Sequence, residues 1–362
     1  MRRAQDHDRR LQMEYRQLGR SGLRVSTLTL GTMTFGTTAL ASSLGHVDEA
    51  GVRRQVDIAL DAGVNLIDTA NMYSIGASET LVGKAIQGRR DQVLISTKVR
   101  FPMADGPNDA GLSRNHILEQ IEASLTRLGT DHVDIYHVHE WDGLTPMEEY
   151  LETLDNLVKS GKVRYLGVSN FAGWQLMKAL ATSDAHNWNR FVSNQIYYSA
   201  EARDAEYELI PLSVDQGLGV MAWAPLAGGL LTGKYRRDAQ PSEGRQITDW
   251  SEPPVRNPDK LWDTIDVLIK IADGHSASPA QIALAYLHAK TGVTTLVIGA
   301  RKEEQLIDNL GAADLKLTQD EVDALDVVSA PDIIYPHWHQ AACVGDRFNA
   351  ADMVLHGPKR PS

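Results

Sequence analysis

Four polar residues lie at or just beyond the ends of three strongly apolar segments: Asp68 and Tyr73 in NLIDTANMY, Lys98 in VLISTKV, and His139 in VDIYHVHEW. The hydroxyl of a free tyrosine has a pKa of about 10, and a neighbouring ammonium lowers that pKa because it favours the phenolate. Lys98 can supply this charge, and Asp68 can supply the counter-charge that keeps a partly desolvated lysine protonated. His139 adds a hydrogen-bond donor for a substrate oxygen. Together the four residues predict a site that protonates a carbonyl while another group delivers hydride.

The elements that must position these residues are eight short apolar segments, which alternate with longer stretches of helical pattern. Each segment is a near-continuous apolar run, which is typical of strands buried on both faces of a parallel sheet. Eight βα units in a chain of this size close most simply into a (β/α)8 TIM barrel, whose active site lies at the carboxyl ends of the strands. The predicted strands are STLTLG, VNLIDTA, QVLISTKV, HVDIYHVH, RYLGVSN, RFVSNQIY, LGVMAWAPL and TTLVIGA.

Capping residues predict where several of the intervening helices begin and end. In a capping box, a Ser or Thr caps the helix and a Glu or Gln three residues later bonds back to it. A proline is favoured directly after the capping residue, at the first helical position. This order occurs twice, in Thr145, Pro146 and Glu148 and in Ser278, Pro279 and Gln281. Glycines that can adopt left-handed backbone angles after a helix are expected at Gly63, Gly129 and Gly161.

The barrel is predicted to span residues 13–330 as one domain. Residues 1–12 are charged and are expected to form a disordered tail. Residues 15–26, YRQLGRSGLRVS, have turn residues between two short runs and predict a hairpin that closes the barrel floor. Residues 331–362 contain no recognisable motif. We expect substrate specificity to reside in this tail and in residues 100–113, since loops at the strand ends carry specificity in barrels.

Composition excludes several classes of protein. The 362 residues are 43% hydrophobic and 23% charged, as in ordinary globular proteins. A net charge of −11 is on balance repelled by phosphate backbones, so nucleic acid is not the expected partner. Cys343 is the single cysteine, and no apolar run approaches the length of a membrane span. A cytoplasmic protein that acts on a small molecule is therefore expected.

Several independent motifs resemble the aldo-keto reductase superfamily, over roughly residues 14–330. They are NLIDTANMYSIGASETLVGKAI, LISTKV, DIYHVHEWD, LGVSNF, WAPLAGGLLTGKY and VIGARKEEQLIDNL. The resemblance implies that Tyr73 is the general acid toward the carbonyl, that Lys98 and Asp68 tune it, and that His139 orients the substrate oxygen. It also implies NADPH bound without a Rossmann fold, and no predicted strand is followed by G-x-G-x-x-G.

The resemblance also indicates which residues would hold NADPH. Donors and acceptors for the nicotinamide carboxamide are expected from Ser169, Asn170 and Gln195, and Trp223 matches the position that stacks on the ring. Arg301 suits the 2′-phosphate that distinguishes NADP from NAD. The pyrophosphate loop falls on Ala224, Pro225, Leu226, Ala227 and Gly228, with Lys234 beyond it. The remaining cofactor candidates are Thr32, Met33 and Asp68, together with Gly299, Gln305, Asp308 and Asn309 for the adenosine end. Phe101 and Trp141 would contact the substrate.

Three competing motifs are rejected on chemical grounds. The segment 228–235, GGLLTGKY, matches G-x-x-x-x-G-K but has Tyr235 where a P-loop needs a hydroxyl for magnesium. His137 and His139 form H-x-H without an accompanying cluster of cysteines or carboxylates at metal-ligand spacing. The histidines of HWH, residues 337–339, are expected to line a polar substrate rim. We therefore predict no metal, and His137 has no assigned role.

Two functions remain open. The first is an NADPH-dependent reductase, or in reverse an alcohol dehydrogenase, that acts on an aldehyde, ketone or secondary alcohol. The second is a nicotinamide-binding regulatory subunit with little turnover, and retention of His139 favours the enzyme.

Two structural questions are also open: Arg245, in the loop 236–260, is a weak candidate for a clamp over the pyrophosphate, and the tail could be a structural cover with Tyr335 and Trp338 buried. The physiological carbonyl, the direction of reaction and the oligomeric state are not determined by sequence.

Overall fold

The computed structural model describes residues 13–36, 47–238, 241–242, 244, 252, 254–344 and 346–357. The predicted Arg245 and the expected disordered tail at residues 1–12 lie outside the described residues. Within these ranges the parallel strands are β3 (Leu28–Gly31), β4 (Leu66–Asp68), β5 (Leu94–Val99), β6 (Val133–Val138), β7 (Val163–Ser169), β8 (Phe191–Tyr197), β9 (Gly219–Trp223) and β10 (Val293–Ile298). Each strand overlaps one of the predicted segments.

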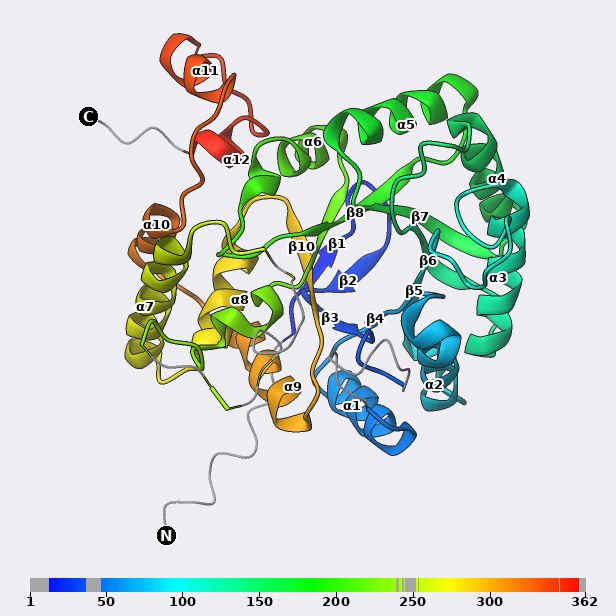
Figure 1. Cartoon of the computed structure of the whole chain (residues 1–362), viewed down its shortest axis with the longest axis horizontal. Coiled ribbons are helices and arrows are strands. Elements are labelled where there is room, and N and C mark those ends of the chain that lie inside the picture. The colour runs from blue at the N-terminus through cyan, green and yellow to red at the C-terminus, as the bar shows by residue number, and fades with distance from the viewer. Residues whose placement is uncertain are drawn as a thin grey trace.

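These strands form one closed barrel in sequence order, with β10 paired to both β9 and β3. The predicted TIM barrel is therefore confirmed. Figure 1 shows the helices arranged as a ring outside the strands. Almost every strand residue is buried, because its side chain faces either the barrel interior or the helical ring. This double burial explains why the strands have continuous apolar sequences.

Helices follow the strands in regular alternation. The α-helices are α1 (Glu49–Asp61), α2 (Ala77–Ala85), α3 (Arg114–Leu128), α4 (Met147–Lys159), α5 (Gly173–His186), α6 (Leu209–Gln216), α7 (Pro258–His275), α8 (Pro279–Ala289), α9 (Glu303–Leu310), α10 (Gln319–Val328), α11 (His337–Cys343) and α12 (Met353–His356). Short 3₁₀ turns are η2 (Tyr73–Gly76), η3 (Arg90–Gln92), η4 (Asp204–Glu206), η5 (Ala227–Thr232) and η7 (Gly311–Asp314).

One of the two predicted capping boxes is wrong. Ser278 caps α8 and exchanges hydrogen bonds with Gln281, as expected. Helix α4 instead starts one residue later than predicted, with Pro146 at the cap position and no side-chain cap. The Thr145 hydroxyl, which was expected to cap the helix, donates instead to the Asp142 carboxylate in the preceding loop at 2.7 Å. The predicted glycines at helix ends all have left-handed backbone angles.

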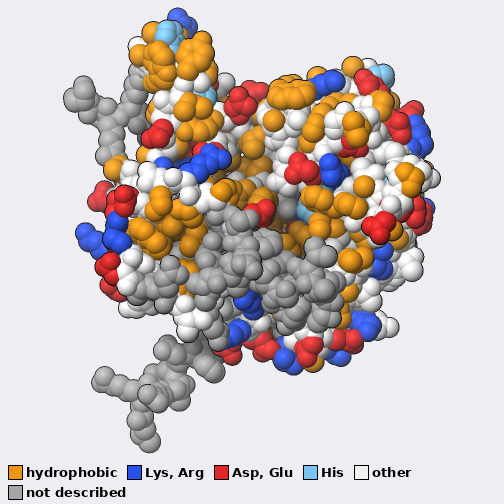
Figure 2. All heavy atoms as spheres, in the orientation of Figure 1, with side chains coloured by type: hydrophobic (Ala, Val, Ile, Leu, Met, Phe, Trp, Pro, Cys, Tyr) orange, Lys and Arg blue, Asp and Glu red, His pale blue; other side chains and the backbone are white. Residues whose placement is uncertain are grey.

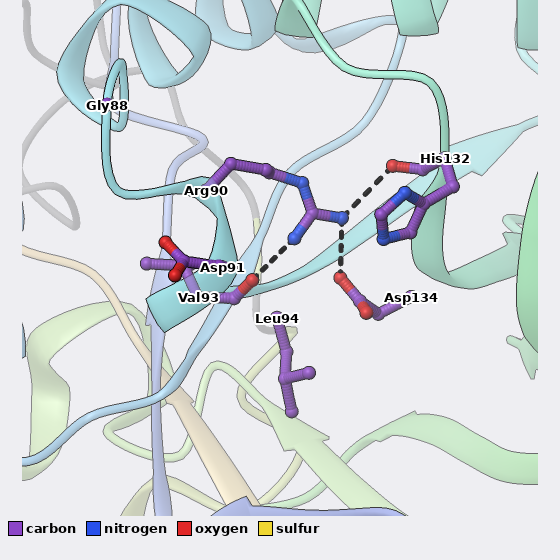
Figure 3. Close-up of a pocket in the computed structure, with 7 residues that line it drawn as sticks. All are labelled: Gly88, Arg90, Asp91, Val93, Leu94, His132 and Asp134. Carbon is purple, nitrogen blue, oxygen red and sulfur yellow. Dashed lines mark hydrogen bonds and ion pairs between the residues drawn. The ribbon is translucent and has the colours of Figure 1, made fainter.

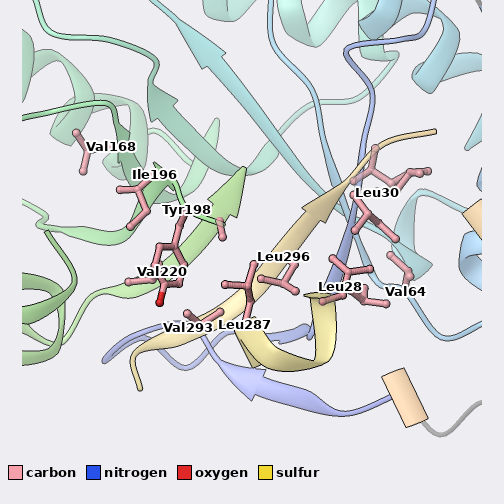
Figure 4. Packing of buried hydrophobic residues seen from close by; sticks show 14 of the residues in the cluster. Leu28, Leu30, Val64, Val168, Ile196, Tyr198, Val220, Leu287, Val293 and Leu296 are labelled. Carbon is pink, nitrogen blue, oxygen red and sulfur yellow. The ribbon is translucent and has the colours of Figure 1, made fainter. Parts of the chain in front are cut away.

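The predicted hairpin consists of β1 (Tyr15–Gln17) and β2 (Arg24–Ser26), which pair in antiparallel fashion. Leu18 and Val25 from this hairpin form an apolar cluster with Leu66, Ile135 and Met221, which belong to β4, β6 and β9. The hairpin therefore plugs the amino-terminal end of the barrel, as predicted. The larger core lies between strands and helices, and Figure 4 shows Leu28 of β3, Leu296 of β10 and Leu287 of α8 packed within it.

A single arginine joins the starts of β5 and β6 at the same end of the barrel. Arg90 donates to the Val93 carbonyl at 2.6 Å, the His132 carbonyl at 3.0 Å and the Asp134 carboxylate at 2.8 Å. Figure 3 shows these contacts on the wall of a surface hollow. The same Asp134 oxygen accepts from the Ile95 amide. Arg90 thus fixes the register of the two strands that carry Lys98 and His139 toward the opposite end.

The C-terminal segment lies at the edge of the barrel, where α12 packs against α6. Figure 2 shows hydrophobic side chains gathered on this segment. Tyr335 is 72% exposed and Trp338 is 52% exposed. The alternative in which both rings are buried against the barrel helices is therefore wrong. In the described part of the chain, no helix combines the length and apolar character needed to cross a bilayer.

We predict opposite effects from two Gly→Ala substitutions within helices. A Cβ at Gly83 of α2 would lie 2.6 Å from the Leu128 carbonyl oxygen at the end of α3, so Gly83→Ala should destabilise the fold by about 1–3 kcal/mol. A Cβ at Gly274 of α7 would meet no atom within 4 Å, so Gly274→Ala should stabilise by roughly 0.4–1 kcal/mol. Urea unfolding of both variants measures the difference, and equal effects would show that α2 does not depend on this close approach.

Candidate active site

The four residues predicted to do chemistry meet at the carboxyl end of the barrel. Asp68 is the last residue of β4, Lys98 lies near the end of β5, Tyr73 begins η2, and His139 directly follows β6. The Lys98 ammonium donates to Asp68 Oδ2 at 2.6 Å, to the Thr69 carbonyl at 2.8 Å and to the Tyr73 hydroxyl at 3.2 Å. The centroids of the Tyr73 and His139 rings lie 5.8 Å apart, edge to face.

The ion pair between Lys98 and Asp68 is shielded from solvent. The Lys98 side chain is 0% exposed and that of Asp68 is 2% exposed. Burial alone would lower the pKa of Lys98, but the attraction of Asp68 and the contact with Tyr73 outweigh burial and raise it. The Asp68 carboxylate also accepts hydrogen bonds from Ser96 Oγ at 2.8 Å and Gln195 Nε2 at 3.0 Å. Lys98 therefore stays charged, and its charge is held against the tyrosine hydroxyl.

Tyr73 departs from the expectation that its pKa is lowered. Burial raises the pKa of the phenol, Lys98 lowers it and Asp68 raises it, with a net shift above the usual value. The sequence indicated the contribution of Lys98 correctly but not the size of the opposing effect of burial. A raised pKa keeps the hydroxyl protonated at neutral pH, and Lys98 lies where an ammonium would stabilise a phenolate.

His139 is a neutral ring at the mouth of the barrel. Burial, assisted by the positive charges of Lys98 and Arg100, holds its pKa well below the usual range. Its Nδ1 has no hydrogen-bond partner among the described residues. Phe101, a predicted substrate contact, packs edge to face on the His139 ring at 4.8 Å. The other predicted substrate contact, Trp141 in the loop after β6, packs edge to face on Phe171 and on Trp174 of α5.

The residues predicted to hold a carboxamide differ in their availability. The Ser169 hydroxyl is buried and has no partner among the described residues. Asn170 donates to the His139 carbonyl at 3.0 Å and accepts from the Trp223 indole at 3.1 Å, so it orients its neighbours. Gln195 donates to Asp68. A buried polar atom without a partner costs free energy, so the Ser169 hydroxyl fits a ligand that carries hydrogen-bonding groups into the mouth.

The loop after β9 has the geometry of an anion cradle. Ala224, Ala227, Gly228 and Gly229 all have left-handed backbone angles, with φ between 48° and 99°. Glycine adopts these angles without steric strain, whereas the two alanines are held in them by the turn. Successive amides in such turns form concavities that bind anions. A Cβ added at Gly229 would lie 3.7 Å from the Lys234 ammonium, which places a positive charge beside the loop. Pro225 and Leu226 lie between the two left-handed alanines, so the whole predicted pyrophosphate segment belongs to this turn.

The residues predicted to surround an adenosine lie after β10. Arg301 is exposed just before α9. The Gln305 side chain accepts from the Arg301 and Lys302 amides, so it caps α9. Asp308 accepts from Ser278 and Gln281 at the start of α8, and Asn309 is buried behind it. A Cβ at Gly299 would lie 3.5 Å from the Gly31 carbonyl oxygen, so Gly299 lies beside the end of β3.

The segment after β3 is linked to β4. The Thr32 hydroxyl donates to the Asp68 carbonyl at 3.1 Å and also accepts from Ser78. Met33 is partly buried beside it. Sequence reasoning missed Ser96, whose hydroxyl contacts Asp68, although Ser96 and Lys98 are alternate residues of one strand and must share a face. Among the described residues, no cluster of three or more His, Cys, Asp or Glu side chains could hold a metal ion.

We predict that Asp68→Asn destabilises the protein by about 3–5 kcal/mol near pH 7, because it leaves the buried Lys98 charge unpaired. In the native protein the pKa of Lys98 is raised, so the pair contributes stability below the unfolded value of about 10.4, and this contribution is lost as pH rises through the folded pKa. In the variant, burial lowers the pKa of Lys98, so the penalty should shrink as pH approaches 10. The double variant Asp68→Asn/Lys98→Met should be more stable than Asp68→Asn in urea titrations, and the reverse order would contradict this account.

Comparison with known proteins identifies close relatives. The family model described as the Aldo/keto reductase family matches residues 27–330. An uncharacterized oxidoreductase, YrpG, of Bacillus subtilis is 41% identical over 319 residues, which cover 85% of this chain and 93% of the relative. A versiconal hemiacetal acetate reductase of Aspergillus parasiticus is 33% identical, covering 90% and 99% of the two chains. A probable voltage-gated potassium channel subunit beta of Arabidopsis thaliana is 35% identical, covering 84% and 92%.

The family match covers the whole closed barrel apart from the hairpin at its floor, and it includes each of the four polar residues at the mouth. The relatives are matched over nearly their full lengths, so the likeness is not confined to one motif. The resemblance stated from the sequence is thereby confirmed, and this chain belongs to the aldo/keto reductase family.

Proposed function

We propose that the protein is an NADP(H)-dependent oxidoreductase that reduces an aldehyde or ketone to an alcohol, or catalyses the reverse reaction, with Tyr73 as general acid and base. The observation that carries the proposal is the contact of the Tyr73 hydroxyl with a buried, charged Lys98 at 3.2 Å. This arrangement supplies a proton and stabilises the anion that remains. The relatives named as an oxidoreductase and as a reductase support the same reaction class.

The residues at the mouth divide the chemistry between them. Tyr73 donates its hydroxyl proton to the carbonyl oxygen, and Lys98 stabilises the resulting phenolate. Asp68 keeps Lys98 protonated. His139 stays neutral at working pH because burial lowers its pKa, so one ring nitrogen donates to the carbonyl oxygen and orients it without adding charge. Phe101 and Trp141 line the approach of the substrate.

NADPH, when bound, would supply the hydride, and Tyr73 would protonate the carbonyl oxygen. Ser169, with its unpartnered hydroxyl, would hold the carboxamide, with Asn170 and Gln195 beside it. Trp223 would support the ring. The left-handed turn at 224–228 and Lys234 would hold the pyrophosphate, and the residues after β10 would hold the adenosine, with Arg301 on the 2′-phosphate.

A second function is supported by relatives named as potassium channel beta subunits. In that case the protein would bind the nicotinamide cofactor as a regulatory subunit and turn over little. The complete set of Tyr73, Lys98, Asp68 and His139 at hydrogen-bonding and packing distances favours the enzyme. Oxidation of NADPH by a panel of simple aldehydes distinguishes the two functions, because the regulatory subunit would bind the cofactor without consuming it.

We propose that substrate preference resides in residues 100–113 and in the C-terminal tail, 331–362. The first loop contains Phe101, which packs on His139. The tail approaches the barrel through Tyr207, whose ring stacks on His337. Its exposed rings lie at the outer edge of the barrel, so the tail would contact only large substrates, or substrates that are entering the mouth.

We predict that Tyr73→Phe lowers the rate of carbonyl reduction by about 10²- to 10⁴-fold, the usual contribution of a general acid. NADPH binding, followed by fluorescence quenching, should change little, because the ring and its packing on His139 are retained. Lys98→Met should be comparably harmful, since it removes the charge that stabilises the phenolate. Unchanged turnover of Tyr73→Phe would exclude this tyrosine as the acid.

We also predict that Arg301→Ala weakens NADPH binding by about 10- to 100-fold, as expected for loss of a charge-assisted contact. NADH, which has no 2′-phosphate, should bind nearly as before. Lys302→Ala is a matched control, because it removes a neighbouring exposed cation. Dissociation constants for both cofactors test the prediction, and equal losses for NADPH and NADH would show that Arg301 does not contact the 2′-phosphate.

A further inference from the structure

His137 is a buried histidine in the barrel interior for which the proposed mechanism has no use. Its side chain is fully buried on β6, and its ring spans the space between β5 and β8. His137 Nδ1 lies 3.1 Å from Ser96 Oγ, and Nε2 lies 3.1 Å from Ser193 Oγ. A Cβ at the neighbouring Gly167 would lie 2.2 Å from the His137 ring, so the absence of a side chain at 167 makes room for it.

The hydrogen bonds around Ser96 determine which ring nitrogen carries the proton. The Asp68 carboxylate can only accept, so the Ser96 hydroxyl must use its single proton on Asp68 Oδ1, at 2.8 Å. Ser96 Oγ can then only accept from His137, which requires a proton on Nδ1. Nε2 is left as an acceptor for the Ser193 hydroxyl. Burial lowers the pKa of His137 to about 3, in agreement with this neutral ring.

We propose that His137 is a positioning residue for the catalytic carboxylate: by donating its Nδ1 proton to Ser96, it holds the Ser96 hydroxyl on Asp68, which in turn fixes Lys98. The catalytic consequence rests on the proposed reductase function, whereas the hydrogen-bond direction does not. Because its side chain is fully buried, His137 would act on the reaction only through Ser96 and Asp68.

The geometry explains why Ser96 needs this support. A serine hydroxyl can rotate among staggered positions, and its proton can be given to any nearby acceptor. Because His137 Nδ1–H donates to Ser96 Oγ, the proton of the Ser96 hydroxyl points toward the Asp68 carboxylate. Gln195 donates to the same carboxylate oxygen at 3.0 Å, so Asp68 retains one support if Ser96 turns away. Loss of His137 should therefore weaken catalysis in part and not abolish it.

The first test is the tautomer of His137 in the full-length protein, measured by ¹⁵N nuclear magnetic resonance of histidine side chains. A difference spectrum against His137→Gln assigns the signals. The proposal expects a neutral ring with the proton on Nδ1 at pH 7. A proton on Nε2, or a doubly protonated ring, would overturn it, because Ser96 could not then be held on Asp68 by this donor. This test needs no turnover, so it remains decisive if the proposed function fails.

The second test compares variants that differ in what they offer Ser96. His137→Leu removes the donor and should lower kcat by about 3- to 10-fold, the worth of one hydrogen bond, with KM for NADPH unchanged. His137→Gln retains an amide donor and acceptor and should restore most of kcat. Ser193→Ala is the matched control, since it leaves the Nδ1 to Ser96 bond in place and should retain most of kcat.

A double variant separates positioning from packing. If His137 acts through Ser96, then Ser96→Ala/His137→Leu should be no slower than Ser96→Ala alone, because the path is already broken. Multiplied losses, or a His137→Leu that matches wild type in kcat, would overturn the proposal. Wild-type protein that consumes no NADPH with any carbonyl would instead refute the proposed function, and the tautomer measurement would then stand alone.

Discussion

A lysine ammonium with no exposed surface is the constraint on which the rest of the structure depends. Taking the charges of Lys98 and Asp68 out of water is costly unless the geometry and the remaining hydrogen bonds are nearly complete. The compensating partners come from β5 and β8, from η2 and from the residue that follows β4. Ser96 and Gln195 are 28 and 127 residues from Asp68, so the charge is tolerable only when the barrel has closed in the correct register. The same closure places the tyrosine hydroxyl against the ammonium.

The barrel interior is built in layers that change in polarity from floor to mouth. Leu66, Ile135 and Met221 pack on the hairpin at the floor. Alternate residues of a strand face the same side, so the next inward-facing residue after Leu66 is Asp68 and the next after Ile135 is His137. Ser96 and Ser193 also belong to this polar layer, and Gln195 of β8 donates a hydrogen bond to Asp68. Hydrogen bonds thus connect several strands in the interior, between an apolar floor and the polar residues at the mouth.

Sequence patterns predicted the strands, the hairpin and the four residues at the mouth because each depends on local features: continuous apolar runs, turn residues and polar groups at strand ends. Features that depend on competition between partners or on the extent of burial were not predicted. The cap of α4 was lost because Asp142 binds Thr145, and the pKa of Tyr73 is raised because burial exceeds the effect of Lys98. Several candidate binding side chains are held by protein partners from other elements, namely Asn170, Gln195 and Asp308.

The bare backbone at Gly167 has a consequence for how this barrel can change over time. A methyl group there would overlap the imidazole of His137 and would lie 2.6 Å from Ser193 Oγ. Any side chain at 167 therefore demands a smaller neighbour at 137, whereas glycine at 167 with a small residue at 137 would leave a void. Replacing Gly167 first would create a clash, and replacing His137 first would leave a void. Substitution of one residue at a time, in evolution or in a laboratory library, therefore passes through a less stable protein in either order.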